Sequence, residues 1–188
     1  MKRSTFAALL AGIALSAPSW AANIEGLART CNNCHGLNGV SAGGSMPSIA
    51  GLPEAYLKNI LMEWKTGKRA SANMTRLISG YTDEEIAGLA EYYAKLPWTP
   101  VAQNIDAKLA AKGKELTKSC RGCHGSTGGD PGDENTPKLN GQLAKYLELE
   151  LVKYKDDAFA MPGMMRMMVK PIKDEDLAAI AAYYASQK

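Results

Sequence analysis

Two short segments share one cysteine-histidine pattern, which constrains this chain more than any other feature. They read Cys31-Asn32-Asn33-Cys34-His35 and, 89 residues later, Cys120-Arg121-Gly122-Cys123-His124. Together they contain all four cysteines and both histidines of the chain. In a C-x-x-C-H segment the two thiols bind a haem covalently, and the adjacent histidine is placed to ligate its iron. We therefore expect two covalently bound haem c groups, attached through Cys31, Cys34, Cys120 and Cys123, with His35 and His124 as iron ligands.

Two other interpretations of these segments are a redox dithiol and half of a zinc site. Both are disfavoured, because each copy carries the histidine and both follow a segment typical of a secretory signal peptide. That segment, residues 1–21, has a basic start, an apolar run from Phe6 to Leu15, and small residues at Ser19 and Ala21. We expect cleavage after Ala21 and a periplasmic protein.

A retained membrane anchor is the alternative for the N-terminal segment, but its apolar run is shorter than the roughly 20 residues that span a bilayer. The mature chain has no other candidate membrane span. Cleavage removes two basic and no acidic residues, so the formal charge falls from +3 to +1. No run of basic residues is present, and we expect no nucleic-acid partner.

An internal repeat predicts two tandem domains. Pro47–Gly51 matches Pro137–Gly141 at an offset of 90, and Trp64 falls on Tyr154 at the same offset. Further along, Asp83 matches Asp174 and the pair Tyr92-Tyr93 matches Tyr183-Tyr184, both at an offset of 91. Two prolines in 96–100 suggest a linker. We expect a signal peptide over 1–21, an N-terminal haem domain over 22–98 and a C-terminal haem domain over 99–188.

Apolar residues with helical spacing predict an all-α fold. The predicted stripes are Leu57, Ile60, Leu61 and Trp64; Ile86, Leu89, Ala90 and Tyr93; and Leu177, Ile180, Ala181 and Tyr184. Thr82 to Glu85 form a capping-box pattern before the second stripe. No segment shows the alternation typical of a strand, and a buried haem would complete the small core that such short domains have on their own.

The second axial ligands are expected to be methionines, since no third histidine exists and thioethers are common sixth ligands in electron-transfer cytochromes. In the first half the candidates are Met46, Met62 and Met74. We select Met74, which we place in an irregular stretch nine residues before Asp83. The repeat carries this choice to Met165, nine residues before Asp174.

The second half has five methionines close together, so other assignments stay open there. Met164 and Met161 are the alternatives to Met165, and the remaining members of the group are Met167 and Met168. The group could also be flexible packing at a haem edge, or a patch for Cu(I), which soft thioethers suit. Lysine, asparagine or a vacant position could replace methionine at either iron. Histidine–methionine ligation would leave no open position for a substrate, which favours electron transfer over catalysis.

The chain resembles the class I diheme cytochromes of bacterial periplasms, including the c4 kind. It is more closely similar to the diheme cytochrome subunit of flavocytochrome c sulfide dehydrogenase, and the resemblance extends over nearly all of the mature chain. The residues that carry it are Pro47–Ala50, Lys65–Gly67, Met74–Leu77, Gly80-Tyr81 and the segment from Ile105 to Cys120. By position it implies His35 and Met74 at the first iron, and His124 and Met165 at the second.

The same resemblance implies a partner. It predicts that the chain is a non-catalytic subunit that receives electrons, one per haem, from an FAD-containing flavoprotein that oxidises sulfide, and passes them to a small cytochrome or an oxidase. The alternative is a freestanding c4-type carrier between a quinol-oxidising complex and a terminal oxidase. A haem enzyme such as a peroxidase would need a displaceable ligand.

Overall fold

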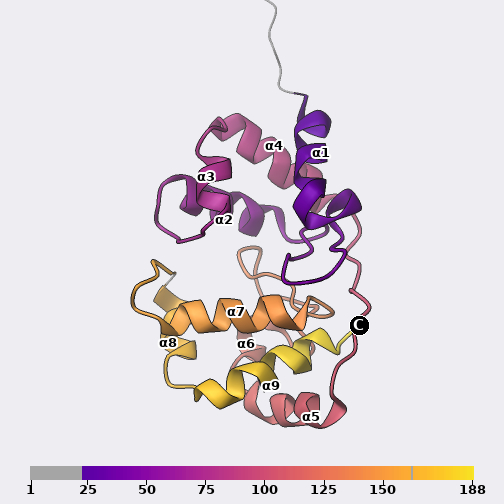
Figure 1. Cartoon of the computed structure of the whole chain (residues 1–188), viewed down its shortest axis with the longest axis vertical. Helices are drawn as coiled ribbons and strands as arrows, with labels where there is room; N and C mark the ends of the chain where they lie inside the picture. The colour runs from indigo at the N-terminus through magenta and orange to yellow at the C-terminus, as the bar shows by residue number, and fades with distance from the viewer. Residues whose placement is uncertain (1–22, 162) are drawn as a thin grey trace, which may run out of the picture.

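The computed structural model describes residues 23–161 and 163–188, so the predicted signal segment lies outside the described residues. The predicted all-α class is confirmed, because every regular element in this part of the chain is a helix. No described helix is long and apolar enough to cross a membrane. We call residues 23–98 the N-terminal half and residues 99–161 with 163–188 the C-terminal half, and the two lie one above the other in Figure 1.

The two halves contain the same order of helices. The N-terminal half has α1 (Ile24–His35), the short 3-10 helix η1 (Leu37–Gly39), α2 (Glu54–Lys65), α3 (Met74–Ile78) and α4 (Asp83–Ala94). The C-terminal half has α5 (Ala107–Leu116), α6 (Arg121–His124), α7 (Ala144–Lys155), α8 (Gly163–Val169) and α9 (Asp174–Ala185). By the repeat, α5 with α6 corresponds to α1, α7 to α2, α8 to α3 and α9 to α4.

The predicted apolar stripes line the cores. In α4, Ile86, Leu89, Ala90 and Tyr93 are all buried, and in α9 so are Leu177, Ile180, Ala181 and Tyr184. The capping box before α4 is also present, because Thr82 and Glu85 exchange side-chain and main-chain hydrogen bonds. Burial of these side chains stabilises the fold by about 25 cal/mol per Å² of apolar surface removed from water.

The segment between α4 and α5 runs along both halves (Figure 1). It passes close to two equivalent glycines, Gly51 and Gly141, which both have φ of +69°. A Cβ on Gly51 would lie 2.4 Å from the Trp98 nitrogen, and one on Gly141 would lie 2.3 Å from Cβ of Pro100. Glycine is required at both positions by backbone conformation and by space. The boundary expected between residues 98 and 99 stays a prediction.

Candidate haem-binding sites

The first cysteine-histidine segment forms the last turn of α1. Cys34 and His35 lie three and four residues after Cys31, so the three side chains share one face of the helix. His35 is buried, Cys31 is half-buried and Cys34 is exposed. Gly36, with φ of +78°, ends the helix, and its N–H donates to the Asn32 carbonyl. Both thiols therefore border the place where the imidazole enters the protein.

The second segment lies in a different helical context. α5 ends at Leu116, and a turn separates it from α6, which contains only the last four residues of the motif. The exposure pattern is nevertheless the same: His124 is buried, Cys120 half-buried and Cys123 exposed. Gly125 ends the helix with φ of +75° and bonds the Arg121 carbonyl. The local geometry of the motif is thus repeated although the helix that leads into it is not.

Both imidazoles are oriented by a proline carbonyl. Nδ1 of His35 lies 2.8 Å from the Pro47 oxygen, and Nδ1 of His124 lies 3.2 Å from the Pro137 oxygen. A carbonyl only accepts, so Nδ1 carries the proton and Nε2 keeps a lone pair for a metal. Burial lowers the pKa of both histidines, against the raising effect of the carbonyl. Each ring is therefore held in the neutral form and the tautomer that iron ligation needs.

The methionines predicted as second ligands both lie in short helices. Met74 is the first residue of α3 and Met165 lies within α8, so the irregular stretch expected around Met74 is wrong. Both side chains are half-buried. Met165 packs against Tyr154, Val169 and Leu177. A five-residue and a seven-residue helix are too short to give a periodic sequence signal, which explains the error.

The other methionines differ sharply in exposure. Met161 is buried, whereas Met164 and Met167 are 70% and 69% exposed and Met168 is 41% exposed. The side chains of Met164, Met167 and Met168 are therefore not packed into the apolar cluster that contains Met161. In the N-terminal half, Met62 lies in α2 as predicted and Met46 is partly exposed. We propose Met74 and Met165 as the axial ligands, with Met161 and Met164 as the alternatives in the C-terminal half.

Buried polar atoms without partners fit a site with a polar ligand. In the described part of the chain, Nε1 of Trp64, Oγ1 of Thr75 and the hydroxyl of Tyr184 are buried and have no hydrogen-bond partner. Buried polar groups cost free energy unless they are bonded, and a haem has two carboxylates that can accept from such donors. The neutral histidines and the accessible thiols fit a covalent haem in each half.

A polar cluster that sequence analysis missed joins the halves. Arg69, which is 6% exposed, donates to Glu63 at 2.9 Å and to the hydroxyl of Tyr154 at 3.2 Å. Its guanidinium also lies 5.8 Å from the centre of the Tyr154 ring. Burial raises the pKa of Tyr56 and Tyr154, so both phenols stay neutral. The repeat matches Trp64 to Tyr154, but nothing in the sequence marks Arg69 as a partner of Tyr154.

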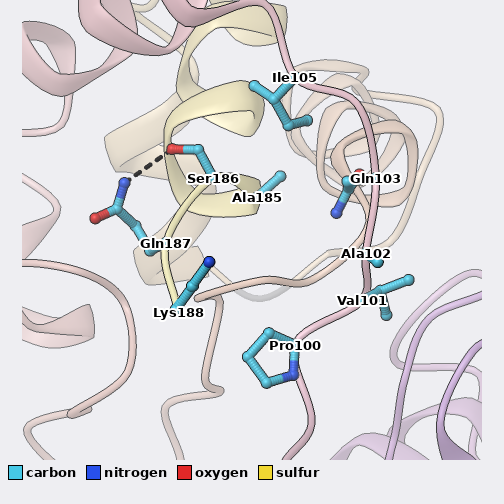
Figure 2. Close-up of a pocket in the computed structure, with 9 residues that line it drawn as sticks. All are labelled: Pro100, Val101, Ala102, Gln103, Ile105, Ala185, Ser186, Gln187 and Lys188. Carbon is cyan, nitrogen blue, oxygen red and sulfur yellow. Dashed lines mark hydrogen bonds between the residues drawn. The ribbon is translucent and has the colours of Figure 1, made fainter.

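A surface hollow of about 450 Å³ lies between the segment after α4 and the C-terminus. Figure 2 shows its walls, which are Pro100–Gln103, Ile105 and Ala185–Lys188. The dashed line joins Nε2 of Gln187 to Oγ of Ser186, at 2.9 Å. None of the cysteines, histidines or methionines of the haem sites lines this hollow, so it has no part in them.

Comparison with known proteins agrees with the two-haem geometry. The cytochrome c family model matches residues 110–188. Cytochrome c4 of Pseudomonas aeruginosa is 30% identical over 186 residues, covering 93% of this chain and 91% of that protein. The thiosulfate dehydrogenase electron acceptor of Thiomonas intermedia is 32% identical over 201 residues, covering 100% and 92%. Reduced recombinant cytochrome c4 from Pseudomonas stutzeri superposes with a TM-score of 0.75 at 25% identity, over 88% of this chain and 97% of that one.

The sulfide dehydrogenase resemblance is more limited than expected. The cytochrome subunit of sulfide dehydrogenase from Chlorobaculum tepidum is 42% identical, but over 72 residues, which is 38% of this chain and 64% of that subunit. The similarities that extend over 93% and 100% of this chain are to cytochrome c4 of Pseudomonas aeruginosa and to the thiosulfate dehydrogenase electron acceptor, respectively. This chain therefore belongs to the cytochrome c4 family of diheme class I electron-transfer cytochromes, and its cofactors are two covalent haem c groups.

Proposed function

We propose that this chain is a periplasmic electron acceptor for a dehydrogenase that oxidises thiosulfate. One observation carries the proposal: an electron acceptor of thiosulfate dehydrogenase aligns with the chain from end to end, at 32% identity. The haem supplies a one-electron iron couple. The neutral imidazoles of His35 and His124 and the thioethers of Met74 and Met165 would hold the two irons, and irons held in this way would have no position open for a substrate.

The electron count suits a protein with two haems. Joining two thiosulfate ions through a new S–S bond releases two electrons and no proton. Two haems would together supply two one-electron couples, so one molecule of this chain could take both electrons from a single turnover. Hydrogen bonds between the halves, including the one from Arg69 to Tyr154, hold the two haem-binding halves together. The electrons then pass singly to a small cytochrome or an oxidase.

Sulfide oxidation by an FAD-containing flavoprotein is the second candidate, supported by the 42% identity to a sulfide dehydrogenase subunit. A flavin also takes two electrons from its substrate, so the electron count does not separate the two donors. The identity to that subunit is confined to 38% of the chain, and for this reason we place it second. A freestanding carrier fed by a quinol-oxidising complex agrees with the c4 relatives and is the third arm of the test.

Rapid mixing separates these donors. The oxidised holoprotein would be mixed with catalytic amounts of thiosulfate dehydrogenase and thiosulfate, of flavocytochrome flavoprotein and sulfide, or of a quinol-oxidising complex and quinol. We expect both haems to be reduced fastest in the first mixture, with no reduction when thiosulfate or the enzyme is omitted. Rapid reduction only by the flavoprotein or only by the quinol complex would overturn the proposal in favour of that donor.

A further inference from the structure

Gln142 of the C-terminal half binds the main chain of the N-terminal half. Its Oε1 accepts from the Ser48 N–H at 3.0 Å, and its Nε2 donates to the Ser48 carbonyl at 2.9 Å. Gln142 and Ser48 are 2% and 1% exposed. The main-chain N–H and carbonyl of Ser48 are thus both bonded to the side chain of Gln142, which lies 94 positions away in the sequence.

The Ser48 N–H belongs to the same planar peptide unit as the Pro47 carbonyl. That carbonyl accepts from Nδ1 of His35 at 2.8 Å. A chain of hydrogen bonds therefore runs from the imidazole through one peptide unit to the amide of Gln142. Bonds in such a chain polarise one another. When Oε1 of Gln142 accepts from the Ser48 N–H, the Pro47 oxygen of the same peptide unit becomes a stronger acceptor for His35. The plane of the peptide is also prevented from rotating away from the ring.

The amide of Gln142 has a rigid base in the C-terminal half. Its Oε1 also accepts from the Leu143 N–H at 3.0 Å, and its main-chain oxygen accepts from Nε2 of Gln103 at 3.0 Å. Gln103 in turn accepts from the Ala144 N–H at 2.9 Å. The preceding residue, Gly141, donates to the Tyr184 carbonyl in α9 at 2.9 Å. Gln142 is therefore held in the C-terminal half by bonds that do not involve Ser48.

The second haem site has no counterpart of this arrangement. At the offset of 90, Gln142 corresponds to Leu52 and Ser48 to Lys138. Leu52 has no amide and is buried in its own core. Among the described residues, no hydrogen bond joins the N-terminal half to Pro137 or Lys138. The bond from His124 to the Pro137 carbonyl is also longer, at 3.2 Å.

We propose that Gln142 is a positioning residue for the axial histidine of the first haem, through which the C-terminal half tunes the first haem and not the second. The inference rests on His35 being the ligand of the first iron. A stronger bond at Nδ1 makes the imidazole a better electron donor, which stabilises the oxidised iron and lowers its reduction potential. Weakening the chain of bonds should raise the potential of the first haem alone.

The test compares three variants of the holoprotein, with the potential of each haem resolved by spectroelectrochemistry and by the signals of the two axial histidines in NMR. Gln142→Met removes both bonds to Ser48 at similar volume. Gln142→Glu keeps the acceptor for the Ser48 N–H. Gln103→Met removes the supporting bonds and leaves the Ser48 peptide untouched, so it reports a merely structural effect of loosening the contact between halves.

For Gln142→Met we expect the electron distribution between the haems to shift about threefold towards the first, which is roughly 28 mV at 59 mV per tenfold for one electron. The His35 signals and exchange of the Ser48 amide should change, with those of His124 unchanged. Gln142→Glu should keep the first haem at or below its original potential. Gln103→Met should lower the stability of the protein without changing the difference between the reduction potentials of the two haems.

Three results would overturn the inference: equal shifts at both haems, no shift in Gln142→Met, or the same shift in Gln103→Met. If Gln142→Met does not fold, the sign of the Gln142→Glu shift decides, because a retained acceptor with added negative charge cannot raise the potential by this route. These potentials do not depend on the electron donor. A holoprotein that thiosulfate dehydrogenase fails to reduce would sink the proposed function and leave this test intact.

Discussion

The first and last helices of each half cross, and the two crossings differ in the size of the residues that meet there. In the N-terminal half, Ile24 of α1 meets Gly88 of α4, and a Cβ on Gly88 would lie 2.7 Å from Cδ1 of Ile24. At the equivalent positions of the C-terminal half stand Gly113 of α5 and Ala179 of α9. A Cβ on Gly113 would lie 1.9 Å from the Ala179 carbonyl oxygen. The first crossing pairs a large residue with glycine, and the second pairs two small residues.

This difference shows which parts of the duplicated fold are constrained by the cofactor and which are free to repack. Close-packed interiors conserve volume, so the loss of a large side chain on one helix is met by closer approach of the backbones. The closer approach of α5 to α9 goes with an α5 that stops at Leu116, before the haem motif, whereas α1 continues through it. The histidine-to-proline bonds are present in both halves.

Removing one pair of thiols should have the largest effect on the comparison. In Cys31→Ala/Cys34→Ala, intact mass should show one haem instead of two, and the N-terminal half should lose its protection from hydrogen exchange, because its core is small without the ring. Cys120→Ala/Cys123→Ala should do the same to the C-terminal half. Two haems in either double variant, or zinc in place of iron in the wild type, would contradict the attachment sites.

Next in size is the loss of a single axial methionine. Met74→Ala should abolish the sulfur-to-iron charge-transfer band of the first haem and lower its potential, since a thioether ligand raises it. Met165→Ala should do the same to the second haem. Met167→Leu is the control, because that side chain is 69% exposed and Met167 is not a candidate ligand. If Met161→Ala removes the second band and Met165→Ala does not, the repeat offset assigns the wrong methionine.

The sequence predicts those features that arise from local rules. The motif spacing identifies His35 and His124, the helical stripes identify the buried faces of α4 and α9, and Thr82 with Glu85 predicts a capped start of α4. Each of these depends on residues within a few positions of one another, so the pattern can be read without knowing the fold.

Features that depend on contacts between the halves could not be predicted in this way. Arg69 is a single basic residue until Tyr154, 85 positions away, is placed beside it. Gln142 is likewise an ordinary polar residue until its amide meets Ser48.

The short helices α3 and α8 also escape detection, because neither is long enough for its periodicity to differ from chance.

Alanine at the two glycines where the first and last helices cross should destabilise the two halves to different extents, and this effect should be smaller than those above. Gly113→Ala forces a methyl group against a main-chain oxygen, which cannot move without shifting α9, and we expect a loss of about 2 kcal/mol or more. Gly88→Ala meets only side-chain atoms of Ile24, Cδ1 at 2.7 Å and Cγ1 at 2.8 Å, and the roughly 1 kcal/mol gain in helix propensity should offset most of the cost of moving them. Denaturation followed by hydrogen exchange in each half measures both, and equal losses would contradict the comparison.

The smallest expected difference concerns the starts of the two last helices. Thr82→Ala removes the acceptor for the Glu85 N–H, at 3.1 Å, and should destabilise α4 by about 1 kcal/mol. In α9 the equivalent start is Lys173, whose side chain makes no capping bond. Lys173→Thr should therefore stabilise α9 by about 0.5 to 1 kcal/mol, while Lys173→Ala serves as the control and should change little.

The reason for expecting a gain at α9 is that its first turn already suits a cap. Asp174, Glu175 and Asp176 place negative charge at the positive end of the helix, and the Lys173 backbone is extended, with φ of −68° and ψ of 144°, as a capping residue requires. The Asp176 N–H donates to the Lys173 carbonyl at 3.0 Å, and a threonine hydroxyl at position 173 would offer this donor a second acceptor. Amide exchange in the first turn of α9 should slow in Lys173→Thr and not in Lys173→Ala. If it slows equally in both, the removal of a positive charge from the helix start is the cause, and the two halves do not differ by a missing cap.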